Sequence, residues 1–62
     1  MDYKERMVEE VIALEQKLDK LEKYLKTESI KTLHWLDVDL IERQFTVMLE
    51  YNTILNARIG RL

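Results

Sequence analysis

The stretch M7-V-E-E-V-I-A-L-E-Q-K-L-D-K-L-E-K-Y-L25 decides the fold, because its apolar residues recur at steps of four and three. This spacing places them on one face of an α-helix, along the seam by which a helix packs against another helix. Most other positions are charged, with acid-before-base pairs four residues apart, as on a solvent-exposed face. The seam consists of Met7, Val11, Leu14, Leu18, Leu21 and Leu25. The pattern predicts a helix over residues 3–26.

A second seam runs through the C-terminal part of the chain. It consists of Ile41, Phe45, Met48, Asn52, Leu55, Ile59 and Leu62. Its one polar member, Asn52, is comparable to the buried Asn residues that fix register and oligomer number in coiled coils; lining a ligand cavity is the alternative. Gly60 is placed to end the helix in a left-handed conformation. The pattern predicts a second helix over residues 34–59, with residues 27–33 as the connection.

The stretch L33-H-W-L-D-V-D-L-I41 alternates apolar and acidic residues in the manner of a half-buried strand. An isolated strand would leave its backbone groups unpaired, and no second strand is predicted. A helix start explains the same residues, with His34 or Thr32 near the cap. Asp37 and Asp39 then face the positive end of the helix dipole. We therefore expect the second helix to begin here.

The second predicted helix has more apolar surface than one neighbour can cover. Its largely apolar arc spans roughly 220°, whereas an ordinary surface helix buries a stripe of about 100°. The 62-residue chain has no Cys and one His, so neither disulfides nor a Cys/His zinc site can supplement a small core. We expect a homo-oligomer whose interface includes Trp35, Leu36, Leu40, Val47, Asn52 and Ile54.

These patterns predict an all-α fold in a single domain, residues 1–62. Two helices of similar length joined by a short connection form an antiparallel hairpin. The simplest way to cover the remaining apolar flank is a homodimeric four-helix bundle with the second helix inside, and higher symmetric assemblies stay open.

Four sequence features recur together over about residues 6–59: R6-M-V-E-E10, L14-x-x-K-L18-x-K-L21, L33 and R43-Q-x-x-x-M48-x-x-Y51-x-x-x-L55-x-x-R58-I59. With these features the chain resembles a family of small uncharacterised tailed-phage proteins related to a crAss-like phage protein. The resemblance implies a phage origin and a helical hairpin, without an activity that can be carried over. The chain departs from the family after Leu33, where apolar residues such as Trp35 and Leu36 stand in place of mostly polar ones.

Polar residues in the apolar arc of the second helix form a candidate ligand site. Gln44, Tyr51 and Arg58 are spaced by seven, and the antiparallel hairpin brings the start of the first helix to the end of the second. Aromatic rings stack on nucleobases, and guanidinium groups match phosphate oxygens in pairs. The expected ligand-binding residues are Tyr3, Lys4, Arg6, Gln44, Tyr51 and Arg58. The alternative is a structural network in which Arg58 pairs with Glu9 or Glu10.

Composition excludes several functional classes. A net charge of -2 provides no basic field for DNA, and no apolar run is long enough to span a membrane. His34 and Asp37 make a weak metal pair, and nothing predicts a cleft that would perturb Asp37 or Asp39 for acid–base catalysis. Without a nucleophile–base pair or a phosphate-binding loop, we expect no enzyme, no cofactor and no metal.

The remaining interpretation is a binding protein. We expect a phage accessory protein that acts in the cytoplasm of the infected host cell by sequestering a nucleotide-derived signalling molecule of antiviral defence. Its partners would be a second copy of itself and a small anionic ligand. Two alternatives stay open: an inhibitor that contacts a host defence protein directly through the stretch around Trp35, and a purely structural helical assembly protein.

Overall fold

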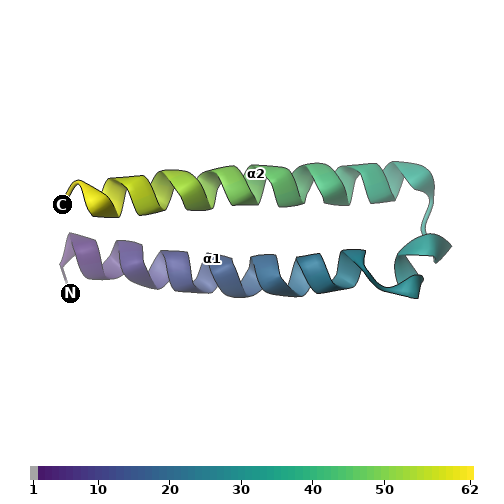
Figure 1. The fold of residues 1–62 in the computed structure, drawn as a ribbon, viewed down its shortest axis with the longest axis horizontal. Helices are drawn as coiled ribbons and strands as arrows, with labels where there is room; N and C mark the ends of the chain where they lie inside the picture. Colours follow the sequence, from purple (N-terminus) through teal and green to yellow (C-terminus); the bar gives the residue numbers. More distant parts are fainter. Residues whose placement is uncertain (1) are drawn as a thin grey trace.

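The computed structural model describes residues 2–62, which form two long antiparallel helices joined by a short 3₁₀ helix (Figure 1). Helix α1 spans Tyr3–Leu25, η1 spans Glu28–Thr32 and α2 spans Trp35–Gly60. The hairpin measures 44 × 15 × 14 Å, and both ends of the chain lie at the same end of it (Figure 1). The predicted all-α helical hairpin is confirmed, while its assembly into an oligomer stays a prediction.

Local hydrogen bonds explain where α1 begins and ends. The Asp2 carboxylate caps the helix by accepting the backbone N–H of Glu5 at 2.7 Å. Beyond the other end, the Thr27 hydroxyl donates to the carbonyl oxygen of Tyr24 at 2.7 Å. Such side-chain bonds compete with the continuation of a helix, so the chain turns here.

The stretch 33–41 enters α2 rather than forming a strand. His34 is the N-cap, and its Nδ1 accepts the backbone N–H of Leu36 at 3.1 Å. Asp37 lies in the first turn, where a carboxylate is favoured by the helix dipole. The short η1 helix inside the connection was not predicted; within it, the Thr32 hydroxyl donates to the carbonyl of Ser29 at 2.7 Å.

The predicted left-handed cap at Gly60 is wrong. Helix α2 includes this residue, and no residue within 2–62 has a positive φ angle. The backbone N–H groups of Arg61 and Leu62 donate to the carbonyls of Arg58 and Ile59, both at 3.1 Å. These short-range bonds close the last turn, so that no left-handed residue is needed.

The core of the hairpin is small and comes mainly from α1. Its most enclosed side chain is Leu55 of α2, which is only 1% exposed. Four buried α1 residues surround it: Met7, Val11, Leu14 and Leu18. The half-buried α2 residues that pack against this cluster are Phe45, Met48 and Ile59. One face of each helix therefore supplies the whole core.

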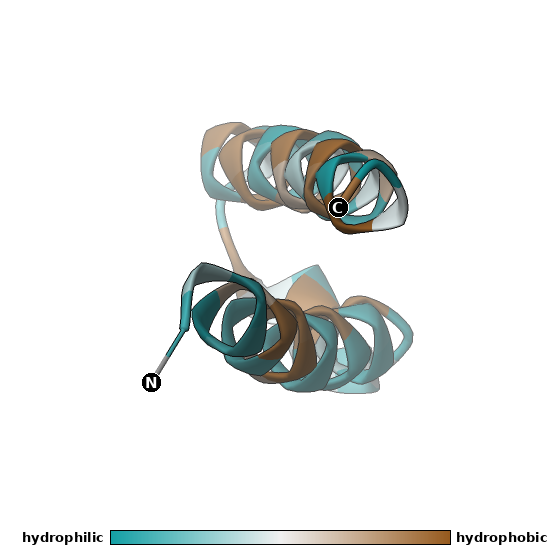
Figure 2. Ribbon diagram, turned by 90° about the vertical axis from the view of Figure 1, so that its left-hand side faces the viewer, coloured by the Kyte–Doolittle hydropathy of each residue, from teal (hydrophilic) through white to brown (hydrophobic). Residues whose placement is uncertain are grey.

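Helix α2 leaves much of its apolar surface in water. Figure 2 shows hydrophobic bands on more than one side of α2. The expected interface residues Leu36, Leu40, Val47 and Ile54 are all exposed, as is Trp35. Large exposed apolar surfaces mark sites of association.

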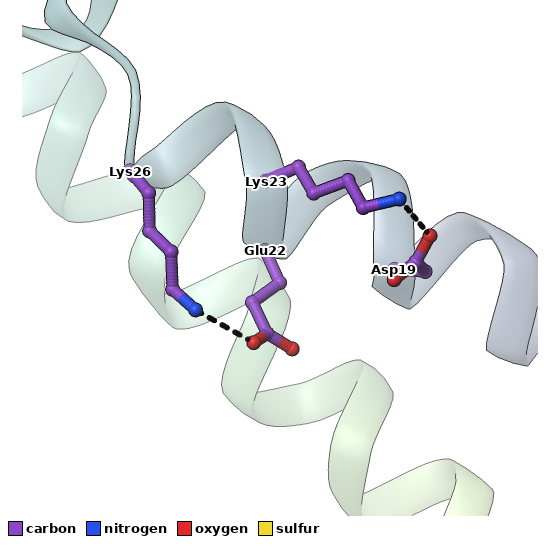
Figure 3. Close-up of polar contacts among 4 residues, drawn as sticks. All are labelled: Asp19, Glu22, Lys23 and Lys26. Carbon is purple, nitrogen blue, oxygen red and sulfur yellow. Dashed lines mark hydrogen bonds and ion pairs between the residues drawn. The ribbon is translucent and has the colours of Figure 1, made fainter.

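The outer face of α1 is polar and carries short-range ion pairs. Lys23 pairs with Asp19 at 2.9 Å and Lys26 with Glu22 at 3.1 Å, each one turn apart (Figure 3). Both pairs are exposed, so each contributes only about 0.3–0.5 kcal/mol. Neither α1 nor α2 contains a stretch apolar enough to cross a lipid bilayer.

The seam residue Asn52 has an unpaired oxygen. Its Oδ1 atom is buried, and no donor within residues 2–62 reaches it. Since an unsatisfied buried polar atom costs about 1–3 kcal/mol, we expect Asn52→Leu to raise the free energy of unfolding by about 1 kcal/mol or more in urea denaturation. The control is Asn56→Leu on the exposed surface, which should change stability by no more than about 0.5 kcal/mol. A loss of stability in Asn52→Leu would instead indicate a partner for this amide outside the single chain.

Candidate functional site

Two side-chain hydrogen bonds join α1 to α2 along one edge of the seam. The Tyr51 hydroxyl donates to the Glu10 carboxylate, and the Arg58 guanidinium donates to the Tyr3 hydroxyl. On each helix the two residues that form these bonds are seven positions apart, which is close to two full turns. Both bonds therefore lie on the same side of the hairpin and follow the same register.

An open hollow lies at the end of the hairpin where the two chain ends meet. We call it the terminal hollow; it measures about 310 Å³ and is lined by Tyr3, Arg6, Met7, Glu10 and Arg58. The guanidinium carbon of Arg58 lies 5.8 Å from the centre of the Tyr3 ring, in a cation–π contact. The hollow thus combines two guanidinium groups with an aromatic ring.

Hydrogen bonding sets the electrostatics of this edge. The pKa of the Tyr51 hydroxyl is raised, mainly by its hydrogen bond to Glu10. Desolvation and the negative charge of Glu10 raise this pKa further, whereas the positive charge of Arg58 lowers it. Within residues 2–62, neither Arg6 nor Arg58 forms an ion pair. The alternative pairing of Arg58 with Glu9 or Glu10 is therefore not found, and both guanidinium groups can accept an anion.

Three of the six expected ligand residues do not line the terminal hollow: Tyr51, Lys4 and Gln44. Tyr51 lies at its border, where it bonds to Glu10. Lys4 lines a separate hollow beside Asp2, Glu5 and Glu9, because one residue step turns the helix by about 100° away from Tyr3. Its neighbours there are acidic.

Gln44 lies about 21 Å along α2 from Arg58, at 1.5 Å per residue. It lines what we call the distal hollow, a depression of about 350 Å³ nearer the connection. The residues around it are Lys17, Lys20, Leu21, Tyr24, Gln44 and Met48. Within one chain, Gln44 therefore does not belong to the terminal hollow.

Sequence reasoning missed two features of this edge. It considered Glu10 only as an alternative partner of Arg58, although Glu10 accepts a hydrogen bond from the Tyr51 hydroxyl. It also gave no role to Tyr24, which lies beside lysines and an apolar surface in the distal hollow. The antiparallel register was the available signal, since aligning the start of α1 with the end of α2 places Glu10 opposite Tyr51.

The comparison with protein families gives one match. The family model described as Sequestin matches residues 1–61, almost the whole chain, and the chain belongs to this family. No curated protein and no solved structure matches it significantly. The relation to a crAss-like phage protein stays a prediction.

The bond between Tyr51 and Glu10 gives a prediction on proton binding. Glu10→Gln removes the charged acceptor, so the pKa of Tyr51 should fall toward its ordinary value, followed by NMR of labelled tyrosine rings in alkaline titration. Because the pKa of Tyr51 is raised by folding, the stability it contributes is present below the ordinary tyrosine pKa and is lost as pH rises through the folded-state value. Glu9→Gln is the matched control. An equal shift in both variants would contradict a specific bond to Glu10.

Proposed function

We propose that this member of the Sequestin family is a non-enzymatic phage accessory protein that counters antiviral defence in the cytoplasm of the infected host cell. It binds a nucleotide-derived signalling molecule and withholds that molecule from its receptor. The family's name, which denotes sequestration, supports this mode of action. Sequestration requires a binding site and no catalytic group, in keeping with a sequence that lacks a nucleophile–base pair.

The observation that carries the proposal is the contact between Arg58 and Tyr3. A guanidinium group held over a tyrosine ring presents both of the surfaces that a nucleotide needs, a cation for phosphate and an aromatic face for the base. Arg6 lines the same hollow and supplies a second guanidinium. Since the two arginines come from different helices, they can approach one anion from two sides.

Glu10 offsets part of this charge, and Arg6 and Arg58 together leave the terminal hollow with a net positive charge. Glu10 accepts a hydrogen bond from Tyr51, so its carboxylate is directed along the seam edge toward α2. The bond from Tyr51 also occupies part of the hydrogen-bonding capacity of this carboxylate, which leaves less of it for an arginine. Arg6 and Arg58 are left to bind phosphate by charge-assisted hydrogen bonds, which are about twice as strong as neutral ones.

A second candidate function is supported by Trp35. Its side chain is 73% exposed and its ring centre lies 5.3 Å from that of His34. Exposed tryptophan is typical of the centres of protein–protein interfaces. A protein that inhibits a host defence protein by direct contact would use this surface, which lies at the opposite end of the hairpin from the terminal hollow. A purely structural assembly protein would bind neither ligand nor host protein.

Nucleotide binding is tested with a panel of cyclic mononucleotides, cyclic dinucleotides, ADP-ribose and cyclic ADP-ribose. We expect at least one of them to raise the unfolding temperature, and Arg58→Ala to weaken its binding about tenfold or more, because a charge-assisted bond is worth about 1.5–3 kcal/mol. Lys31→Ala, which removes an equal charge from the connection at the far end of the hairpin, should bind as the unaltered protein does. If no compound shifts the unfolding temperature, the proposed function is wrong.

The two modes of action differ in which variant restores defence. Cells that carry a nucleotide-signalling defence system and express this protein are challenged with phage, and plaque numbers are counted. We expect Arg58→Ala to restore defence and Trp35→Ala to leave the inhibition intact, since only the arginine touches the ligand. The reverse outcome would favour direct contact with a host protein.

A further inference from the structure

An apolar stripe runs along α2 beside the seam edge that carries Tyr51 and Arg58. It consists of Leu36, Leu40, Val47 and Ile54, which are spaced by four and seven residues and so follow one line along the helix. Their side chains are 46%, 53%, 63% and 51% exposed. A continuous apolar line of this kind is the usual contact surface for another helix.

The exposed area of the chain matches the needs of a dimer. The protein exposes 5030 Å², whereas a monomeric protein of its mass exposes about 4,250 Å². The elongated shape of the hairpin, 44 × 15 × 14 Å, gives rise to this excess of about 800 Å², which is comparable to the area that each partner buries in an interface of standard size. A second copy carries the same stripe and can cover it by two-fold symmetry, without any other molecule.

We propose that a second copy of this chain packs antiparallel on the stripe about a two-fold axis close to Val47, and that its Lys17, Lys20 and Tyr24 complete the ligand site begun by the terminal hollow. The pairing of the two chains follows from the hairpin itself. The role of the added residues in binding rests on the proposed function.

Charge on α2 selects the antiparallel arrangement. Arg43 and Glu50 lie along the border of the stripe that is turned away from α1. About an axis at Val47, Leu40 lies opposite the partner's Ile54. Arg43, which pairs with Asp39 of its own helix at 3.0 Å, then also lies near the partner's Glu50. In a symmetric parallel pair the two-fold axis runs along the helices, so the borders that carry Arg43 and Glu50 would lie on opposite sides of the interface and these opposite charges would not meet. Opposite charges across an interface favour a pairing, and like charges oppose it.

Charge on α1 selects the same arrangement independently. The register of the hairpin aligns Val47 with Leu14, because Val47 precedes Tyr51 by four residues and Leu14 follows Glu10 by four. The two-fold axis therefore passes α1 near Leu14, close to the point where its charge changes sign. Residues 3–15 carry Glu5, Glu9, Glu10 and Glu15 with Lys4 and Arg6, and residues 16–26 carry Lys17, Lys20, Lys23 and Lys26 with Asp19 and Glu22. The part of one α1 with net negative charge then lies along the part of the other with net positive charge.

The same axis brings the two hollows together. The terminal hollow surrounds Arg6 and the distal hollow surrounds Leu21, and these residues lie eight before and seven after Leu14. Both hollows open on the seam edge that borders the stripe, so each terminal hollow faces the partner's distal hollow. The joint site has an aromatic ring from each copy, the arginines of one and the lysines of the other.

Engineered disulfides test the pairing without any ligand, since the chain has no cysteine of its own. We expect Val47→Cys to form a covalent dimer under mild oxidation and the control Thr53→Cys, on another side of α2, to stay monomeric. Leu40→Cys should link to Ile54→Cys when the two proteins are mixed, and not to itself. In the antiparallel pair two copies of position 40 are about 21 Å apart, whereas a disulfide needs Cα atoms within about 7 Å. Self-linking of Leu40→Cys, or no link at Val47→Cys, would overturn the proposal.

Subunit mixing tests the shared site with the same nucleotide panel. Arg58→Ala and Lys20→Ala should each abolish tight binding alone, while an equal mixture should recover about a quarter of the binding capacity, since random pairing of subunits gives mixed dimers with one intact site. No recovery would show that both residues belong to a site within one chain. Disulfide links without any nucleotide binding would support the pairing and overturn the proposed function instead.

Discussion

The structure depends on one constraint, which is that a single helix can cover only one face of its neighbour. In this hairpin α1 covers the seam of α2 and encloses Leu55 almost completely, yet the stripe through Val47 remains in water. Within residues 2–62 no further long helix lies over the stripe, and the short η1 helix stays at the connection. The exposed stripe is therefore a consequence of the apolar composition of α2.

The same constraint places the polar residues. Polar side chains at the edge of a two-helix seam are only partly covered by the neighbouring helix. They form hydrogen bonds across the seam, and their outer side stays in contact with solvent. Tyr51 to Glu10 and Arg58 to Tyr3 are bonds of this kind, and their common two-turn spacing ties them to the register that aligns the core. Packing and candidate binding site are thus positioned by one geometric relation, and a slip of the helices would disturb both.

Much of this could be predicted from sequence because the apolar period is regular. The seams of both helices and the turn between them follow from residue spacing alone. The site was predicted less well, because which residues line one hollow depends on their angle around the helix axis and on their position along it. The angle separates Lys4 from Tyr3, and the position along the axis separates Gln44 from Arg58. The ending of α2 at Gly60 also escaped prediction, since tight backbone bonds closed the helix where a left-handed glycine was expected.

A site built from Tyr3 and Arg58, at the two ends of one chain, links ligand binding to folding. A ligand bound there holds the first turn of α1 against the last turns of α2, where helix ends are otherwise prone to fray. A ligand at a hundred times its dissociation constant adds about 2.7 kcal/mol to the stability of the bound state. That is large for a hairpin with five buried side chains within residues 2–62, because small domains are stable by only a few kcal/mol. If the partner copy contributes the other half of the site, the same free energy also favours assembly. A single hairpin would then bind its ligand weakly, whereas a dimer would release it slowly.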